Sequence, residues 1–443
     1  MKAAIALLAT AMALALSGCV GLSAADRGPR TDPVAHLQTT TPSPWTDNLG
    51  DPVLAALLAR ADAGSLDVKA ALARLEKADA ELEAAEAAGR LQVNVGAIAA
   101  VGNRSFNNGA RSAATPTLET TLDLDVWHLF RKGREAARDE HSAAAWDVDA
   151  ARLMVAAETV RTYAALQTAR DAEASASRRR DSTGAALGFV RLRVSAGAAS
   201  ARDLDPRAHE AAAAAVQLEQ ARAEIALQSA RLADLIGQPG LAPPPDAPVP
   251  AARAVPSAPS AQVDARPDVK AAYARLAAAD HRRAAAILAA RPKFQIVAAL
   301  GSPDAAIATL LDIRALAWAA AGTITHQLID GGARRAQVHI ASAEADIADI
   351  AYRQAVLNGW SEIRAGLAAE ANAAGQLTIA EADLAAARAA RRDGETRHAA
   401  GVADGLAVAA LAAQVETAGD ALRQARLAAV DAHERRVLAA GGA

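Results

Sequence analysis

TLETTLDLDV, residues 117–126, alternates strictly between two kinds of side chain. One set is Leu118, Thr120, Leu122, Leu124 and Val126, and the other is Thr117, Glu119, Thr121, Asp123 and Asp125. A period of two is that of a β-strand, because successive side chains of a strand point to opposite faces. The stretch therefore predicts a strand with one apolar face and one polar, acidic face. Residues 91–102, LQVNVGAIAAVG, predict its partner strand.

The sequence around these strands occurs twice along the chain. DVKAALARLEKAD begins at Asp67 and DVKAAYARLAAAD begins at Asp268, and ten of these 13 positions are identical. Further on, QARAEIALQSARLADLIG pairs with QARLAAVDAHERRVLAAG, so that Gly237 corresponds to Gly441. The offset between the copies stays between 201 and 204 residues, which indicates one duplicated unit. KFQIVAALG, residues 293–301, and AWAAAGTITHQLI, residues 317–329, predict the two strands of the second copy.

Each copy predicts the same order of elements: a helix, two strands, a very long helix, a glycine-containing break and a second long helix. The helices are expected at 52–89, 134–192 and 203–236, and again at 267–290, 333–393 and 404–440. Residues 239–266 are rich in proline, which interrupts helices, and predict a connector. The chain should therefore consist of a first repeat, 52–238, this connector, and a second repeat, 267–443.

The long helices carry a seven-residue period. Residues of the first copy spaced by sevens are Leu204, Ala211, Leu218, Ile225 and Leu232, and residues of the second copy are Val408, Val415 and Leu422. A heptad repeat of apolar residues predicts helices that wrap around each other in a left-handed coiled coil. An uninterrupted helix of ~60 residues is ~90 Å long, which exceeds the length of an ordinary globular helix.

The composition disfavours several classes of protein. The 443 residues carry a net charge of −3, which argues against a scaffold that binds nucleic acid through a basic field. One cysteine excludes an intramolecular disulfide bond. Sequence motifs of zinc proteases, serine hydrolases, nucleotide-binding loops and redox enzymes are absent, and no residue pattern predicts a metal or another cofactor. We therefore expect no catalytic activity.

The amino terminus predicts an exported protein. Lys2 precedes the apolar segment AAIALLATAMALAL, which is shorter than the roughly 20 residues of a membrane-spanning helix. An ordinary secretory signal with an incidental cysteine would fit. LSGC, residues 16–19, also resembles the lipid-attachment motif of bacterial lipoproteins, in which the cysteine is acylated and becomes the first mature residue. The favoured interpretation is a lipoprotein signal peptide, residues 1–18, lipidation at Cys19, and a lipid-anchored extended segment, residues 19–51.

Four amphipathic strands in an exported chain are too few to form a closed barrel by themselves. Such strands usually pack on a soluble core, but the sequence offers no further layer of apolar helices to cover them. Within a bilayer an open sheet edge leaves backbone groups without partners, and transmembrane barrels need at least about eight strands. Two chains would supply eight strands and three would supply twelve, and only the wider ring encloses a useful aqueous lumen. The polar faces, with Glu119, Asp123 and Asp125, would then face the lumen.

Several segments together resemble a known family. They are ARPDVKAAYARLAAAD, LIDGGARRAQ, AYRQAVLNGWSEIRAGL, RHAAGVADGLAV and LADLIG. In this order and duplicated, they are similar to the TolC-like outer-membrane factors, in particular the lipoproteins that serve RND-type multidrug pumps. The resemblance implies a homotrimer in the outer membrane, with a twelve-stranded β-barrel that continues into a periplasmic α-helical barrel. It further implies a passive efflux duct that works with a periplasmic adaptor (membrane fusion) protein and an inner-membrane RND-type pump.

In a duct of this kind, the turns between the long helices would form the closed periplasmic tip. Gly197 and Gly401 mark these turns, and the candidate gate residues beside them are Asp203, Asp205, Asp404, Arg202 and Arg397. Rings of carboxylates favour cations and can be closed by neighbouring basic groups. A simpler role for Asp203 or Asp205 is to cap the following helix, and we consider capping the commoner role for a single aspartate.

Two other functions stay open at this point. The chain could be a lipid-anchored periplasmic coiled-coil scaffold or adaptor without a pore, with its strands in a soluble hairpin module. A periplasmic enzyme is the third possibility, and it has the least support from the sequence.

Overall fold

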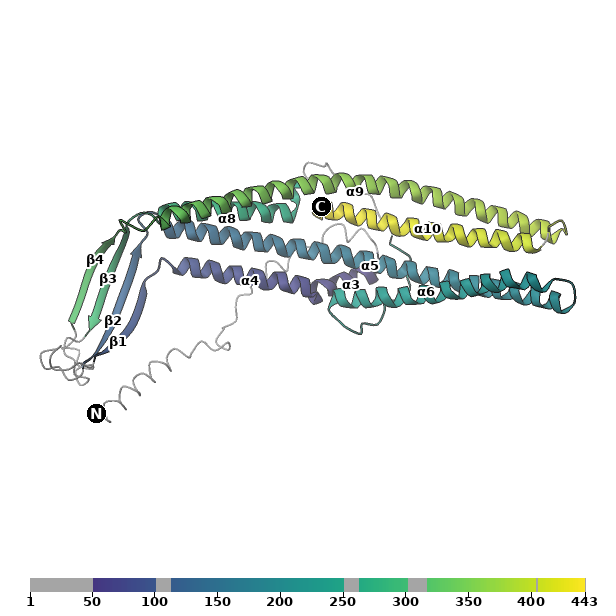
Figure 1. The fold of residues 1–443 in the computed structure, drawn as a ribbon, viewed down its shortest axis with the longest axis horizontal. Coiled ribbons are helices and arrows are strands. Elements are labelled where there is room, and N and C mark those ends of the chain that lie inside the picture. Colours follow the sequence, from purple (N-terminus) through teal and green to yellow (C-terminus); the bar gives the residue numbers. More distant parts are fainter. Residues whose placement is uncertain (1–50, 101–112, 251–262, 302–316, 404, 443) are drawn as a thin grey trace, which may run out of the picture. The chain divides into compact units, whose positions relative to one another are not determined.

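The computed structural model describes residues 51–100, 113–250, 263–301, 317–403 and 405–442. Each copy of the duplicated sequence forms an opening helix, two strands and a long helical hairpin (Figure 1). The first copy contains α3 (Pro52–Gly64), α4 (Leu66–Ala87), β1 (Gln92–Ala100), β2 (Ala113–Leu124), α5 (Leu129–Ser195), the 3₁₀ turn η1 (Ala201–Asp203) and α6 (Leu204–Ile236). The second contains α8 (Pro267–Leu288), β3 (Lys293–Gly301), β4 (Ala317–Thr325), α9 (Ala333–Ala399) and α10 (Gly405–Ala439).

The four strands form one antiparallel sheet in the order β1-β2-β3-β4. The central pairing joins the two copies: Leu124 lies opposite Phe294, and Asp123 opposite Gln295. The predicted strand pairs are therefore part of a single sheet, whose outer strands are β1 and β4. The ends of the strands that join the helices lie at one level, because Lys293 pairs with Thr325 and Leu124 with Phe294.

The helices continue the order of the strands. β1, β2, β3 and β4 are joined to α4, α5, α8 and α9, and these four helices pack on one another in that same order. Beyond the ends of α4 and α8, the hairpin partners α6 and α10 take their places against α5 and α9 (Figure 1). α5 and α9 each have 67 residues, which corresponds to a length of ~100 Å. We call each long helix, or each pair of helices that follow one another along the molecule, a helix row. Each strand is joined to the end of one helix row.

The predicted heptad seam is confirmed where α6 packs on α5. Leu218 and Leu232 of the seam are buried, and Leu204, Ala211 and Ile225 are half-buried. Ala214 and Gln228, which lie four residues before Leu218 and Leu232, are buried as well. This alternation of three and four residues is the pattern of a coiled-coil interface, with small side chains that let the backbones come close.

Several predicted boundaries are wrong by a few residues, and one predicted helix is divided. The helix expected over 52–89 ends at Gly64, and a new helix begins at Leu66. α5 extends beyond the predicted 134–192 at both ends, and α9 continues to Ala399. β2 begins at Ala113, four residues before the alternating stretch. The alternating pattern predicted only the part of β2 in which large apolar and polar side chains alternate, so the start of the strand was missed.

The division at Gly64 lies at a close contact between two backbones. A Cβ atom on Gly64 would lie 2.0 Å from the carbonyl oxygen of Ile236, and a Cβ on Gly237 would lie 2.4 Å from the carbonyl oxygen of Gly64. Gly237 ends α6 with a φ of 68°, in the left-handed region that glycine adopts readily. The end of α6 therefore contacts the α3–α4 junction through its backbone, at two glycine residues that have no side chain. The second copy repeats this contact, with Gly441 against the backbone of Arg266.

We predict that Gly64→Ala destabilises the protein by about 2 kcal/mol, because the added methyl group has no space beside the Ile236 carbonyl group. Gly184→Ala is the matched control, since Gly184 lies within α5 and nothing lies within 4 Å of its added Cβ. Alanine favours a helix over glycine, so the control should unfold at the same or a higher temperature. Circular dichroism of both variants in detergent measures this, and equal melting temperatures would contradict the steric argument.

Candidate functional site

The two faces of the sheet differ sharply. Every charged residue of the four strands lies on one face, whose polar residues include Gln92, Asn94, Glu119, Thr121, Asp123, Lys293, Gln295, Thr323 and Thr325. The opposite face carries Val93, Leu118, Leu122, Leu124, Phe294, Ile296 and Ile324. No helix of the described chain covers either face (Figure 1), and Ile324 is 70% exposed. The apolar face is thus open to whatever surrounds the sheet.

Two of the predicted lumen acids lie on the polar face. Glu119 is exposed, and Asp123 is half-buried. Asp123 accepts a hydrogen bond of 2.5 Å from the side-chain amide of Gln295 on the neighbouring strand. Because Asp123 and Gln295 come from different copies of the repeat, this bond holds the two halves of the sheet in register on their polar side.

The third predicted acid, Asp125, is not a strand residue, and that part of the prediction is wrong. β2 ends at Leu124, and both carboxylate oxygens of Asp125 accept hydrogen bonds of 3.0 Å, from the backbone N–H groups of Phe130 and Arg131. The first N–H groups of a helix have no partner within the helix, so a carboxylate there stabilises the start of α5. Asp330 does the same for α9, and its contacts to Arg334 and the backbone lower the pKa of Asp330 to about 2.

The two hairpin turns are built alike. Gly197 and Gly401 follow the ends of α5 and α9 with φ values of 71° and 74°. Ala198 donates its N–H to the carbonyl oxygen of Arg193, and Val402 donates to that of Arg397. These bonds close the last turn of each helix in the manner of a glycine-ended helix. Both turns are exposed, and Val402 presents 78% of its surface.

The structure gives Asp203 a local partner. Its carboxylate accepts the N–H of Ser200 at 3.0 Å, while the Ser200 hydroxyl oxygen accepts the N–H of Arg202 at 3.2 Å. This reciprocal pair is a capping box of the 3₁₀ turn η1, which leads directly into α6, and the Asp203 side chain does not cap α6 itself. Asp205 lies two residues further on, exposed in the first turn of α6, and the Arg202 side chain is exposed as well.

The remaining gate candidates belong to the second hairpin. Arg397 forms an ion pair of 3.0 Å with Asp393, one turn earlier on α9, and both side chains are largely exposed. Asp404 lies outside the described residues, as does the predicted lipidation site Cys19. Among the described candidates, Asp203 and Arg397 therefore form contacts within their own hairpins.

Hydrogen bonds and ion pairs connect the two hairpins at a distance from these turns. Glu416 of α10 accepts hydrogen bonds from Ser175, at 2.7 Å, and from Arg178 of α5, and Asp420 pairs with Arg179 at 2.7 Å. Burial opposes the charge on Glu416, but the bonds from Ser175 and Arg178 outweigh it and lower its pKa. Any separation of α5 from α10 must break these bonds.

A buried acid lies in a second contact between α10 and α5. Glu434 is 3% exposed, and burial, together with the nearby charge of Asp431, raises its pKa to about 9. Glu434 is therefore protonated at neutral pH. A neutral carboxyl group costs far less to bury than a charged one, so this part of the interface tolerates an acidic residue.

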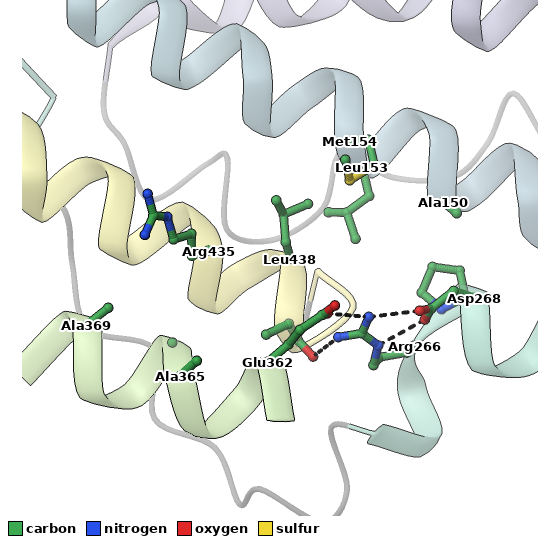
Figure 2. Close-up of a pocket in the computed structure, with 13 residues that line it drawn as sticks. Ala150, Leu153, Met154, Arg266, Asp268, Glu362, Ala365, Ala369, Arg435 and Leu438 are labelled. Carbon is green, nitrogen blue, oxygen red and sulfur yellow. Dashed lines mark hydrogen bonds and ion pairs between the residues drawn. The ribbon is translucent and has the colours of Figure 1, made fainter. Parts of the chain in front are cut away.

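A cavity of about 500 Å³ lies where α5, α8, α9 and α10 meet, and Figure 2 shows the residues that line it. Arg266, which is 6% exposed, lies at its edge and binds Asp268 at 2.8 Å, Glu362 at 2.7 Å and the carbonyl oxygen of Ala439 at 2.9 Å. One side chain thereby connects the start of α8, the middle of α9 and the end of α10. Most of the lining is uncharged, with alanine the commonest residue, and Arg266, Asp268 and Glu362 are engaged with one another, so the cavity offers structure rather than reactive groups.

Within residues 51–100, 113–250, 263–301, 317–403 and 405–442, no group of histidine, cysteine and acidic side chains has the arrangement of a metal site. No helix in these ranges has both the length and the hydropathy to cross a membrane.

The sequence pattern did not reveal the contacts made by Arg266, Glu416 and Asp420. Glu416 and its partner Ser175 are 241 residues apart, and their spacing follows no local period. Arg266 had a weak signal, because the matching position of the first copy, by the offset of 201, holds Ser65. A charge in one copy, where the other copy has an uncharged residue, indicates a partner from elsewhere in the fold.

Comparison with known proteins agrees with this architecture. Residues 57–238 and 259–442 match the outer membrane efflux protein family. The outer membrane protein OprJ of Pseudomonas aeruginosa is 28% identical over 291 residues, which cover 61% of this chain and 60% of OprJ. The alignment thus spans less than two thirds of the length of that relative.

Solved structures extend the comparison to nearly the whole chain. The outer-membrane channel OprN is 25% identical, with a TM-score of 0.81 over 91% of this chain and 93% of that chain. The outer membrane channel CmeC of Campylobacter jejuni has a TM-score of 0.82 at 19% identity, over 90% of this chain and 88% of that chain. The likeness to CmeC shows a shared fold.

We predict that Asp203→Ala accelerates amide hydrogen exchange in residues 198–206 about fivefold, because the capping box loses its carboxylate acceptor. Asp205→Ala is the matched control, since it removes an exposed carboxylate from the same turn and leaves the box intact. Hydrogen-exchange mass spectrometry of the intact protein compares the two. Equal exchange rates in both variants would show that Asp203 is not a cap.

Proposed function

The chain belongs to the outer membrane efflux protein family, and on this basis we propose that it is the outer-membrane channel of a tripartite efflux system. The single observation that carries this function is the amphipathic sheet. Its charged residues share one face, its apolar face is uncovered, and β1 and β4 are open edges. A sheet of this kind is completed by lipid on one side, water on the other and further strands at both edges.

A homotrimer meets all three requirements. In this assembly β4 of one copy pairs with β1 of the next, and twelve strands close a barrel in the outer membrane. Glu119 and Asp123 then face the lumen, where water solvates their charges. Because the helix rows follow the strand order, the same three-fold arrangement places α9 of one copy beside α4 and α6 of the next. The barrel then continues as a helical tunnel into the periplasm.

The hairpin turns form the periplasmic end of this tunnel in our proposal. They are the surface for a periplasmic adaptor protein and an inner-membrane RND-type pump, which drives transport while the channel itself is passive. Asp205 and Asp404, with Arg202 and Arg397, remain candidates for a ring of charge at the closed tip. The bonds of Glu416 and Asp420 to α5 add resistance to opening, since they join the two hairpins of one copy.

The amino terminus fits the same proposal. A lipoprotein signal, residues 1–18, and acylation of Cys19 would assist sorting and assembly in the outer membrane. The transported molecules would be small drugs or toxic compounds, and neither a cofactor nor a catalytic activity is needed. A scaffold without a pore does not explain why the polar and apolar residues of the sheet are separated on two faces. We therefore consider a scaffold the second candidate function.

Reconstitution and genetics together test this function. We expect the purified protein to form discrete ion-conducting pores in planar lipid bilayers, and a deletion strain to become more susceptible to drugs. Re-expression of the intact chain should restore resistance. A protein that stays monomeric and water-soluble once its lipid is removed, and conducts no ions, would exclude a channel and favour the scaffold.

A further inference from the structure

Basic side chains gather where the strands meet the helices. The four connecting segments, residues 88–91, 125–135, 289–293 and 326–335, are called the junction collar here. They contain eight basic residues, Arg90, Arg131, Lys132, Arg134, Arg291, Lys293, Arg334 and Arg335, and three acidic ones, Asp125, Glu135 and Asp330. The whole chain has a net charge of −3, so this surplus is local. The strand register places all four segments at one level (Figure 1).

One arginine of the junction collar is held against an aromatic ring. The guanidinium carbon of Arg291 lies 4.8 Å from the centre of the Trp127 ring, a distance at which a cation and an aromatic face attract each other. Trp127 in turn contacts Phe294, with ring centres 6.1 Å apart. Arg291 is exposed to solvent, whereas Trp127 and Phe294 are half-buried. The charge therefore lies at the outer end of an aromatic pair.

Two hydrogen bonds fix the backbone that carries Arg291. The indole N–H of Trp127 donates to the carbonyl oxygen of Pro292 at 2.8 Å, and Arg334 donates to the carbonyl oxygen of Ala290 at 3.3 Å. Arg334 is itself held by Asp330 at 2.7 Å. The residues on both sides of Arg291 are thus attached to different helix–strand junctions. A group held in this way loses little conformational freedom when it binds a ligand.

The arginine stands directly beside the apolar face of the sheet. Phe294 belongs to that face, and its register partners Leu124 and Ile324 are 41% and 70% exposed. Along the molecule, the positive charge is followed by aromatic rings and then by exposed aliphatic side chains. This order of groups is complementary to an amphiphile that has an anionic head group and an acyl chain.

The position of this group within the sheet leaves it accessible in an assembly. Trp127 follows β2 and Arg291 precedes β3, and these are the two central strands. Neighbouring copies that pair with β1 and β4 reach the outer strands only. Each copy of a trimer would therefore keep its own group open toward the surroundings, unlike the exposed Leu328 and Ile329, which follow the edge strand β4.

We propose that Arg291 and Trp127 form a binding site for an anionic phospholipid of the membrane leaflet that surrounds the junction collar. Arg291 binds the lipid phosphate group, Trp127 lies at the head-group level, and the acyl chains cover Leu124, Phe294 and Ile324. The remaining basic residues of the collar raise the local concentration of anionic lipid. This inference rests on the proposed function, because it requires that the apolar face of the sheet lies in a bilayer.

Native mass spectrometry of the detergent-purified protein tests the site. Wild type is titrated with phosphatidylglycerol and, separately, with zwitterionic phosphatidylcholine. We expect one preferential phosphatidylglycerol site per copy and weaker binding of phosphatidylcholine. Arg291→Gln should weaken phosphatidylglycerol binding about fivefold, because it removes the charge that contacts the lipid phosphate group directly. Arg335→Gln removes an exposed charge of the same collar that lies on α9, and it should retain most of the binding.

Three results would overturn the proposal. They are equal phosphatidylglycerol binding by wild type and Arg291→Gln, equal binding of both lipids by wild type, and displacement of the lipid by millimolar inorganic phosphate, which would indicate a general anion site. Pore formation in planar bilayers is recorded for every variant. Pores without selective lipid binding contradict the lipid site alone, whereas a wild type without pores contradicts the proposed function.

Discussion

A sheet with two open edges and one uncovered apolar face imposes the constraint on which the rest of this structure depends. Backbone N–H and C=O groups at the outer sides of β1 and β4 need partners, and Val93, Leu118, Ile296 and Ile324 need an apolar environment. The chain itself supplies neither in its described part. The charged residues meanwhile share the other face, so water must reach that side. Lipid, lumen and neighbouring strands satisfy these demands together.

The helices are arranged by the same constraint. Because every strand is joined to a helix at one level, the order of the sheet becomes the order of the helix rows. Glycine pairs let the end of α6 meet the α3–α4 junction, and Arg266 attaches the end of α10 to α8 and α9. Both copies therefore use close backbone contact at a glycine in this junction, and the second copy adds a buried charge with three partners. Duplication explains the common plan, and these substitutions explain the differences.

The repeat and the periodicities predicted the order of elements because they depend on local pattern. Alternation over 117–126 gave the two faces of β2, and the seven-residue spacing from Leu204 to Leu232 gave the face of α6 that packs on α5. Asp125 was misplaced because an alternating pattern does not mark where a strand ends and a helix cap begins. The division at Gly64, the Arg266 contacts and the Glu416 bonds depend on residues far apart in sequence, so no local period could reveal them. Asp203 had two possible roles in the sequence, and its carboxylate takes part in the capping box of η1 rather than capping α6 itself.

Cysteine cross-linking between the outer strands tests the central claim, that β4 of one copy pairs with β1 of another in a closed trimer. Variants would carry one introduced cysteine in β1, at Gln92 or Asn94, and one in β4, at Thr323 or Thr325. Variants with only one of the two introduced cysteines show whether cross-links arise from the native Cys19. Within one chain β2 and β3 separate these strands by ~14 Å, whereas a disulfide needs Cα atoms within about 7 Å. Oxidation in the membrane should therefore give covalent dimers and trimers and nothing larger. A chain that stays monomeric at every pair of positions, or a ladder that continues beyond three copies, would contradict the closed trimer.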